Sequence, residues 1–203
     1  MIGKRAKILS RDHVEDLLVF AAQTRHPIRN QVLMLLSVKA GLRAGEIANL
    51  TWSMLVEPSG EIGKSLELQS RIAKKGSGRV IPIHPDLHAA LLKLGHLSPL
   101  LAGPVIQSER GGPMKPISIV CWFAKAYQAI GLEGCSSHSG RRTLITRAAR
   151  LVHKAGGSLR DVQLLAGHRS IQTTQRYIDG DTAASVRSVC SRCGQWRSRW
   201  LDR

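Results

Sequence analysis

Strand-like sequence is confined to one stretch of this chain, which limits the folds it can adopt. Three short runs, residues 53–57, 65–69 and 79–83, are separated by turns rich in Pro, Gly and Ser and predict an antiparallel sheet. Elsewhere the apolar residues recur at the spacing of helices, and no strand–helix–strand repeat is found. The sequence therefore predicts a mainly α protein with a small three-stranded antiparallel sheet (α+β), which argues against nucleotide-binding folds.

Residues that begin and end helices mark out the helical parts. Ser10 can cap a helix that runs to about Gln23, and Pro27 can occupy the first turn of a helix that ends at Gly41. Ser158 can cap another, which ends near residue 167. Further helices are predicted at about 44–50, 85–94, 117–130, 139–154, 173–177 and 182–189, with a long loop at 95–116.

The charge of the chain indicates a polyanionic partner. Its 203 residues include 30 Lys and Arg against 14 Asp and Glu, a formal net charge of +16. The stretch from Arg141 to Arg203 holds thirteen of these basic residues, and twelve of them are Arg, whose planar fork matches phosphate oxygens. Aromatic residues make up only 4%, which favours DNA over RNA because specific RNA readers usually stack bases.

Neither a membrane span nor a secretion signal is expected. No apolar run reaches the roughly 18 residues that a spanning helix needs, and no long apolar segment follows the basic start MIGKRAKILSRDH. We therefore expect a cytoplasmic protein with free thiols at Cys121, Cys135, Cys190 and Cys193. Cys190 and Cys193 form a single CxxC without a second pair, so no metal site is predicted.

Two short motifs place basic residues where they can hold a phosphate. Arg43 and Glu46 in GLRAGEI are three residues apart, so the carboxylate can orient the guanidinium; the alternative is a surface ion pair. His138 and Arg141 in SSHSGRRT lie on one side of a helix start, where backbone N–H groups favour an anion. The alternative there is a helix-capping cluster with a solvated arginine.

Two further motifs offer a nucleophile and an acid. His168 and Tyr177 in AGHRSIQTTQRY follow a helix end, whereas the only other tyrosine, Tyr127, has the apolar surroundings of a core residue. A phenol ionises near pH 10, so it needs nearby cations to become a nucleophile. Lys74 and Lys75 lie at the tip of a predicted hairpin, where a lysine can protonate a leaving oxygen; a solvated turn is the alternative.

The order of these elements, GLRxxE, a hairpin lysine, HxxR and GHx8Y, resembles the signature of the tyrosine site-specific recombinase (phage integrase) family from about residue 9 to 177. The resemblance implies the catalytic-domain fold of that family and no cofactor. It implies catalytic roles for Arg43, Glu46, Lys74 (with Lys75 as the alternative), His138, Arg141, His168 and Tyr177, the nucleophile. We also predict DNA contacts by Arg142, Arg147, Arg169 and Arg176.

The reaction implied is metal- and ATP-independent DNA strand transfer. Tyr177 would attack the scissile phosphate and form a 3′-phosphotyrosyl link, while Arg43 and Arg141 hold the phosphate oxygens. His168 would add a hydrogen bond to the phosphate. Lys74 would protonate the leaving 5′-oxygen, and His138 would assist proton transfer. The function implied is that of a site-specific recombinase or integrase that cuts and rejoins DNA. The outcome could be integration, excision, inversion or resolution.

The resemblance also implies an organisation and an assembly. We expect a catalytic domain at residues 1–180 and a basic tail at 181–203, whose helix is exchanged between protomers. The first helix begins near residue 10, so no N-terminal core-binding domain is expected, as in the small fimbrial phase-variation invertases. We expect a bacterial or phage-derived, nucleoid-associated protein. It would form a tetramer on double-stranded DNA and be weakly associated or monomeric without DNA. A separate accessory DNA-binding protein is a possible further partner.

Two departures from the family pattern keep other interpretations in view. HSGRR replaces the commoner HxLRH, and the segment from Arg141 to His168 is a few residues longer than expected. The alternative function is a catalytically silent DNA-binding relative, or a truncated integrase remnant that acts as an accessory factor. A type IB topoisomerase shares the chemistry and would be separated by strand exchange between two sites. The complete set of catalytic residues favours the enzyme.

Overall fold

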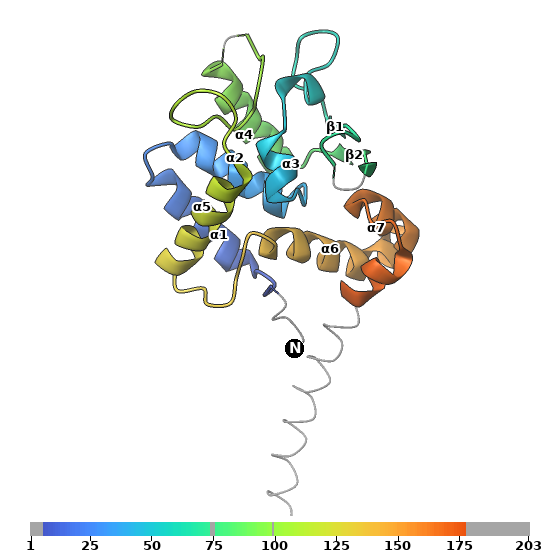
Figure 1. The fold of residues 1–203 in the computed structure, drawn as a ribbon. Coiled ribbons are helices and arrows are strands. Elements are labelled where there is room, and N and C mark those ends of the chain that lie inside the picture. Colours follow the sequence, from blue (N-terminus) through green and yellow to red (C-terminus); the bar gives the residue numbers. More distant parts are fainter. Residues whose placement is uncertain (1–5, 74–75, 99, 178–203) are drawn as a thin grey trace, which may run out of the picture.

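The computed structural model describes residues 6–73, 76–98 and 100–177, and these form a mainly helical protein (Figure 1). The predicted helix at 182–189, the tail, Cys190, Cys193, Lys74 and Lys75 lie outside the described residues. The elements are α1 (Arg11–Ala22), α2 (Pro27–Val38), α3 (Ala44–Ala48), η1 (Trp52–Met54), β1 (Ser65–Leu68), β2 (Arg79–Pro82), α4 (Pro85–His96), α5 (Pro116–Ala129), α6 (Ser139–Leu151), η3 (Val152–Ala155) and α7 (Leu159–Ala166). Residues 171–177 form a further helix after α7.

The helix ends follow the local signals in the sequence. The Ser10 hydroxyl accepts a hydrogen bond from the backbone N–H of His13 at 3.0 Å and caps α1. Pro27 occupies the first turn of α2. Gly167, with φ of 63°, ends α7 in the left-handed conformation that glycine adopts readily. The three predicted helix ends are thus confirmed. They could be predicted because each depends only on neighbouring residues.

The sheet has two strands, so the predicted third strand at residues 53–57 is wrong. β1 and β2 pair in antiparallel register from Ser65 opposite Pro82 to Leu68 opposite Arg79. The N–H groups of residues 55 and 56 both donate to the carbonyl of Trp52, at 2.8 and 3.0 Å, so the chain closes into a 3-10 turn. The adjacent side chains of Met54 and Leu55 are both buried, which a strand with alternating faces does not allow.

The buried apolar side chains of the described residues form two hydrophobic clusters. The larger one joins α1 to α5 with the strand pair, and Trp52 and Phe123 are fully buried in it. The smaller one, formed by α6 and α7, contains Ile145, Ala149, Val162 and Ala166. Figure 1 shows α6 running from the larger body to the lobe of α7, which lies beside the strand pair. The side chain of Arg141, near the start of α6, bonds to both parts, at the carbonyls of Gly41 and Ala166.

Two close contacts fix α6 against the rest of the molecule. Gly140 packs on α2 so tightly that a Cβ there would lie 2.9 Å from Val38 Cγ1. On another side, the Leu9 N–H donates to Thr143 Oγ1 at 2.8 Å, and Arg147 donates to the Leu9 carbonyl at 3.0 Å. The segment before α1 thus runs along α6. In the three described ranges, no helix combines the length and the apolar character that crossing a membrane requires.

Candidate active site

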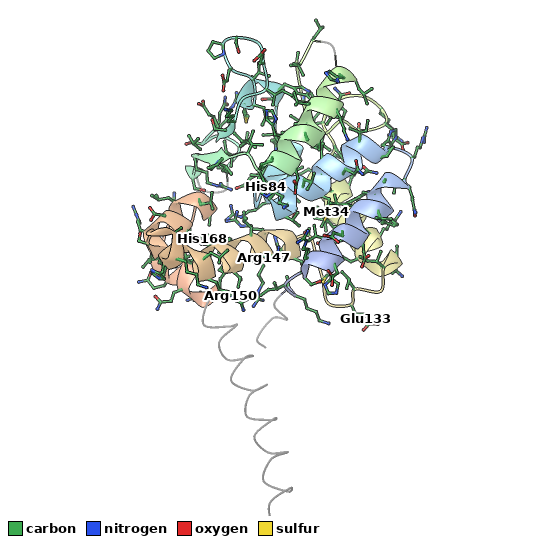
Figure 2. All side chains as sticks on the ribbon, turned by 180° about the vertical axis from the view of Figure 1, so that it is seen from behind. Met34, His84, Glu133, Arg147, Arg150 and His168 are labelled. Atoms are coloured by element: carbon green, nitrogen blue, oxygen red, sulfur yellow. The ribbon has the colours of Figure 1, made fainter. Side chains whose placement is uncertain are left out.

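An open pocket of about 620 Å³ collects five of the seven residues predicted to be catalytic. They come from four elements far apart in the sequence: the start of α3, the start of α6, the turn after α7 and the helix at 171–177. Figure 2 shows one of them, His168, in the lobe of α7. The five are Arg43, His138, Arg141, His168 and Tyr177, and the wall is completed by Ala6, Ser136, Arg142, Thr173 and Arg176.

Arg43 and Glu46 form the ion pair that their spacing predicts. Arg43 is the residue before α3, and its terminal nitrogen donates to Glu46 Oε1 at 2.8 Å while its backbone N–H donates to Oε2 at 3.0 Å. The Glu46 side chain is 2% exposed and the Arg43 side chain 23%. Glu46 is therefore a buried support, and Arg43 is the partner that reaches the pocket.

Arg79 is a residue of this site that sequence reasoning missed. It begins β2, and its two terminal nitrogens donate to the two Glu46 oxygens at 3.2 and 3.1 Å. Burial by itself would raise the pKa of Glu46, but the hydrogen bonds and positive charges of Arg79 and Arg43 outweigh it and hold that pKa below its usual value. The alternation of β2 puts Arg79 on the buried face with Ile81, which is the one signal the sequence offered.

Arg141 is a buried cation anchored to backbone carbonyls. Its side chain donates to the Gly41 carbonyl at 2.6 Å and to the Ala166 carbonyl, and the residue is 3% exposed. Burial, together with the positive charge of Arg43, lowers the pKa of Arg141 to about 10. At neutral pH the guanidinium stays charged, so Arg141 and Arg43 both present a cation to the pocket.

His168 is a buried imidazole held on both sides. Its Nδ1 lies 3.0 Å from the Thr174 hydroxyl, and its carbonyl accepts a hydrogen bond from the Gln163 side chain at 2.8 Å. Burial, followed by repulsion from Arg141, Arg43 and Arg79, lowers the pKa of His168 to about 4. His168 is therefore a neutral hydrogen-bonding group at neutral pH.

The two tyrosines have opposite surroundings, as the sequence predicts. Tyr177 is half-buried at the pocket and stacks on His168 with ring centroids 5.4 Å apart. Tyr127 is 2% exposed inside the larger cluster, and burial raises its pKa above the ordinary value of 10.0. Of the two, only Tyr177 lies beside cations that can stabilise a phenolate.

The remaining predicted residues have mixed placements. His138 is exposed at the start of α6. Arg142 and Arg176 line the pocket, and Arg142 also donates to the Ala6 carbonyl at 2.8 Å. Arg147 holds the Leu9 carbonyl, and Arg169 lines a separate pocket between α7 and β2. Contacts of these four arginines with DNA remain a prediction.

Of the four cysteines predicted to be free thiols, the structure describes Cys121 and Cys135. Cys121 is exposed and Cys135 half-buried, and both are free. Within residues 6–73, 76–98 and 100–177, no group of three or more His, Cys, Asp or Glu side chains is arranged to hold a metal ion.

Most of the chain is similar in sequence to known proteins. The tyrosine recombinase XerC of Brucella suis biovar 1 (strain 1330) is 31% identical over 158 residues, which are 76% of this chain and 47% of the relative. The chain spans about half the length of the curated relatives it matches.

Two solved structures share the fold. XerA recombinase has a TM-score of 0.67 and 23% identity, with 84% of this chain and 59% of that chain covered. The lambda integrase tetramer bound to a Holliday junction has a TM-score of 0.63 and 24% identity, with 85% of this chain and 48% of that chain covered. The two-stranded, mainly helical fold is thus a known one.

The phage integrase family model matches residues 7–183. This range contains every residue that lines the pocket except Ala6. The chain therefore belongs to the phage integrase family, the tyrosine recombinases.

Proposed function

We propose that this chain carries the catalytic domain of a site-specific recombinase, which cuts and rejoins DNA through a covalent bond to Tyr177. One observation carries the proposal: two arginines, two histidines and a tyrosine from four separate elements line the same open pocket. The domain corresponds to residues 1–180, and residues 181–203 are a basic tail. The net charge of +16 supports DNA as the substrate.

Cleavage proceeds by in-line displacement at phosphorus. The Tyr177 oxygen attacks the scissile phosphate, its bond to phosphorus forms, and the bond from phosphorus to the 5′-oxygen breaks. The products are a 3′-phosphotyrosyl link and a 5′-hydroxyl. The Tyr177 hydroxyl gives up its proton as its oxygen bonds to phosphorus, and His138, which lines the same pocket, assists this proton transfer. Lys74, outside the described residues, protonates the departing oxygen.

Arg43 and Arg141 stabilise the charge that grows on the phosphate. Arg141 uses two of its five N–H donors on the carbonyls of Gly41 and Ala166, and the proposal assigns its other donors to a phosphate oxygen. Arg43, 23% exposed and braced by Glu46, contacts a second oxygen. Both guanidiniums are held before the substrate arrives, so little reorganisation is needed in the transition state.

His168 contributes a neutral hydrogen bond. Its low pKa, about 4, keeps the ring uncharged at neutral pH. We assign the hydroxyl proton of Thr174 to the contact with Nδ1, which puts the ring hydrogen on Nε2. Nε2–H then donates to the phosphate, while the stacked Tyr177 ring lies alongside.

Rejoining reverses the same steps. The 5′-hydroxyl of a second strand attacks the phosphotyrosyl bond and releases Tyr177, so the bond energy is retained and neither ATP nor a metal ion is consumed. Exchange between two DNA sites requires several protomers, and we propose a tetramer assembled on DNA. Support comes from the lambda integrase, solved as a tetramer bound to a Holliday junction.

A covalent-adduct assay in EDTA tests the proposal. Protein and supercoiled DNA from its genomic neighbourhood are mixed and quenched with detergent, and protein-linked DNA is counted for wild type, Tyr177→Phe and Tyr127→Phe. Tyr127 is the matched control, because its buried hydroxyl has no hydrogen-bond partner within the described structure. We expect adduct from wild type and Tyr127→Phe and none from Tyr177→Phe, which still binds DNA. Adduct from Tyr177→Phe contradicts the proposal, and absence of adduct from all three favours a binding-only relative.

A further inference from the structure

Arg79 is a buried arginine for which the cleavage steps have no use. It lies 33 residues after Glu46 and 86 before Leu165, and it contacts both. Its side chain is 5% exposed, which excludes a direct role as a surface DNA contact. An arginine is costly to bury unless each of its donors is satisfied, so the partners of this one are informative.

One side of the Arg79 fork fixes the carboxylate that holds Arg43. Glu46 Oε1 accepts from Arg43 at 2.8 Å and from Arg79 at 3.2 Å, and Oε2 accepts from Arg79 at 3.1 Å. Arg43 has one side-chain bond to this carboxylate, whereas Arg79 has two in parallel. The bidentate pair therefore sets the plane of the carboxylate, and Arg43 takes its direction from it.

The other side of the fork holds the end of α7 that precedes His168. The last carbonyls of a helix have no partner within it. Arg79 Nε donates to the Leu165 carbonyl at 2.9 Å, and Arg141 donates to the carbonyl of the next residue, Ala166. At Gly167 an added Cβ would lie 2.9 Å from a terminal nitrogen of Arg79, so the guanidinium rests directly against the turn.

We propose that Arg79 is a positioning residue of this active site: one guanidinium holds Arg43 through Glu46 and holds His168 through the end of α7. Three parts of the chain, β2, α3 and α7, are thereby locked to one side chain, and two groups that face the phosphate depend on it. The catalytic consequence of this inference rests on the proposed function; the contacts themselves do not.

The test compares Arg79→Lys with Arg29→Lys. Lysine keeps one positive charge but not the fork, so it cannot hold both carboxylate oxygens and the Leu165 carbonyl. Arg29 is a matched control, since it is a half-buried arginine that donates to the Gln107 carbonyl at 3.0 Å and is absent from the pocket lining. We expect Arg79→Lys to slow single-turnover cleavage of bound DNA about 100-fold, with DNA affinity within about threefold of wild type. Arg29→Lys should cleave at the wild-type rate.

A neutral scissile linkage separates positioning from general loosening. In a duplex that carries the cleavage site mapped with wild type, a methylphosphonate replaces the scissile phosphate and removes one negative charge. Arg43 is then less needed, so the deficit of Arg79→Lys relative to wild type should shrink below about 10-fold. Equal deficits on both duplexes, or cleavage by Arg79→Lys at the wild-type rate, overturn the inference.

A titration keeps the inference testable apart from activity. The carboxyl ¹³C resonance of Glu46, assigned by its loss in Glu46→Gln, is followed against pH in folded wild type and Arg79→Lys. Without the fork, burial dominates, and the pKa of Glu46 should rise clearly above the wild-type value. An unchanged Glu46 pKa overturns the inference, whereas absence of adduct from wild type with a raised pKa sinks only the proposed function.

Discussion

Replacing Glu46 with glutamine should destabilise the folded chain strongly, although only one atom changes. The carboxylate, 2% exposed, accepts four hydrogen bonds, two from Arg43 and two from Arg79. A glutamine presents one acceptor oxygen and one NH₂ group to these donors, so donors face donors on one side. The positive charge of Arg79, 5% exposed, would remain buried without its counter-ion.

The magnitude follows from the burial of this pair. Removing one partner of a buried ion pair costs about 3–5 kcal/mol, because the charge left behind is uncompensated. For a chain of this length, each kcal/mol lowers the melting temperature by about 2–4 °C, so a fall of roughly 6–20 °C is expected. The effect is therefore large enough for an ordinary unfolding experiment.

The assay is urea unfolding followed by circular dichroism, with Glu109→Gln as the control. Glu109 also pairs with two basic groups, Arg25 and His26, but its side chain is 53% exposed. Pairs of that kind contribute about 0–1 kcal/mol. If Glu46→Gln loses no more stability than Glu109→Gln, the claim that Glu46 is a buried support is refuted.

The pH dependence of Glu46→Gln adds an independent check. The pKa of Glu46 in the folded state is lowered from its ordinary value of 4.5. The stability it contributes is complete above that value and is lost as the pH falls through the folded pKa. The difference between wild type and Glu46→Gln should therefore narrow in acid.

Two further predictions concern packing and pH. Gly140→Ala should lower the free energy of unfolding by about 1–3 kcal/mol, since its Cβ would lie 2.9 Å from Val38 Cγ1. In the control Gly45→Ala the new Cβ has nothing within 4 Å, so no loss of stability is expected. Equal urea midpoints for the two variants would contradict this. The pKa of His168 is about 4 when folded and 6.5 ordinarily, so stability should fall by up to about 3 kcal/mol between those values as pH drops. His168→Gln should flatten that slope, and an unchanged slope contradicts the assignment.

Local signals in the sequence were sufficient for the helix ends and for single motifs. Ser10, Pro27 and Gly167 each act on neighbouring residues, and the pairing of Arg43 with Glu46 follows from their spacing. The segment at 53–57 was mispredicted because its short apolar run suits a strand or a buried turn equally well. The segment forms a turn because the Trp52 carbonyl accepts hydrogen bonds from the N–H groups of residues 55 and 56.

The site as a whole depended on contacts between distant residues. Nothing near Arg141 indicates that it donates to Gly41, 100 residues earlier. The family pattern, rather than spacing, grouped Arg141 with Arg43. Arg79 was missed for the same reason. The alternation of side chains along β2 predicts that Arg79 points inward, but it does not predict that Glu46 and Leu165 are its partners. Lys74 lies outside the described residues, so its role stays a prediction.

The most direct test of the proposed function identifies the amino acid that carries the DNA. Wild-type adduct formed on cleaved DNA is digested with nuclease and protease, and the peptide that retains a nucleotide is sequenced by mass spectrometry. We predict a nucleotide joined through its 3′-phosphate to Tyr177, with a free 5′-hydroxyl on the other DNA end. A nucleotide on any other residue, or protein linked to the 5′-end, would contradict the account.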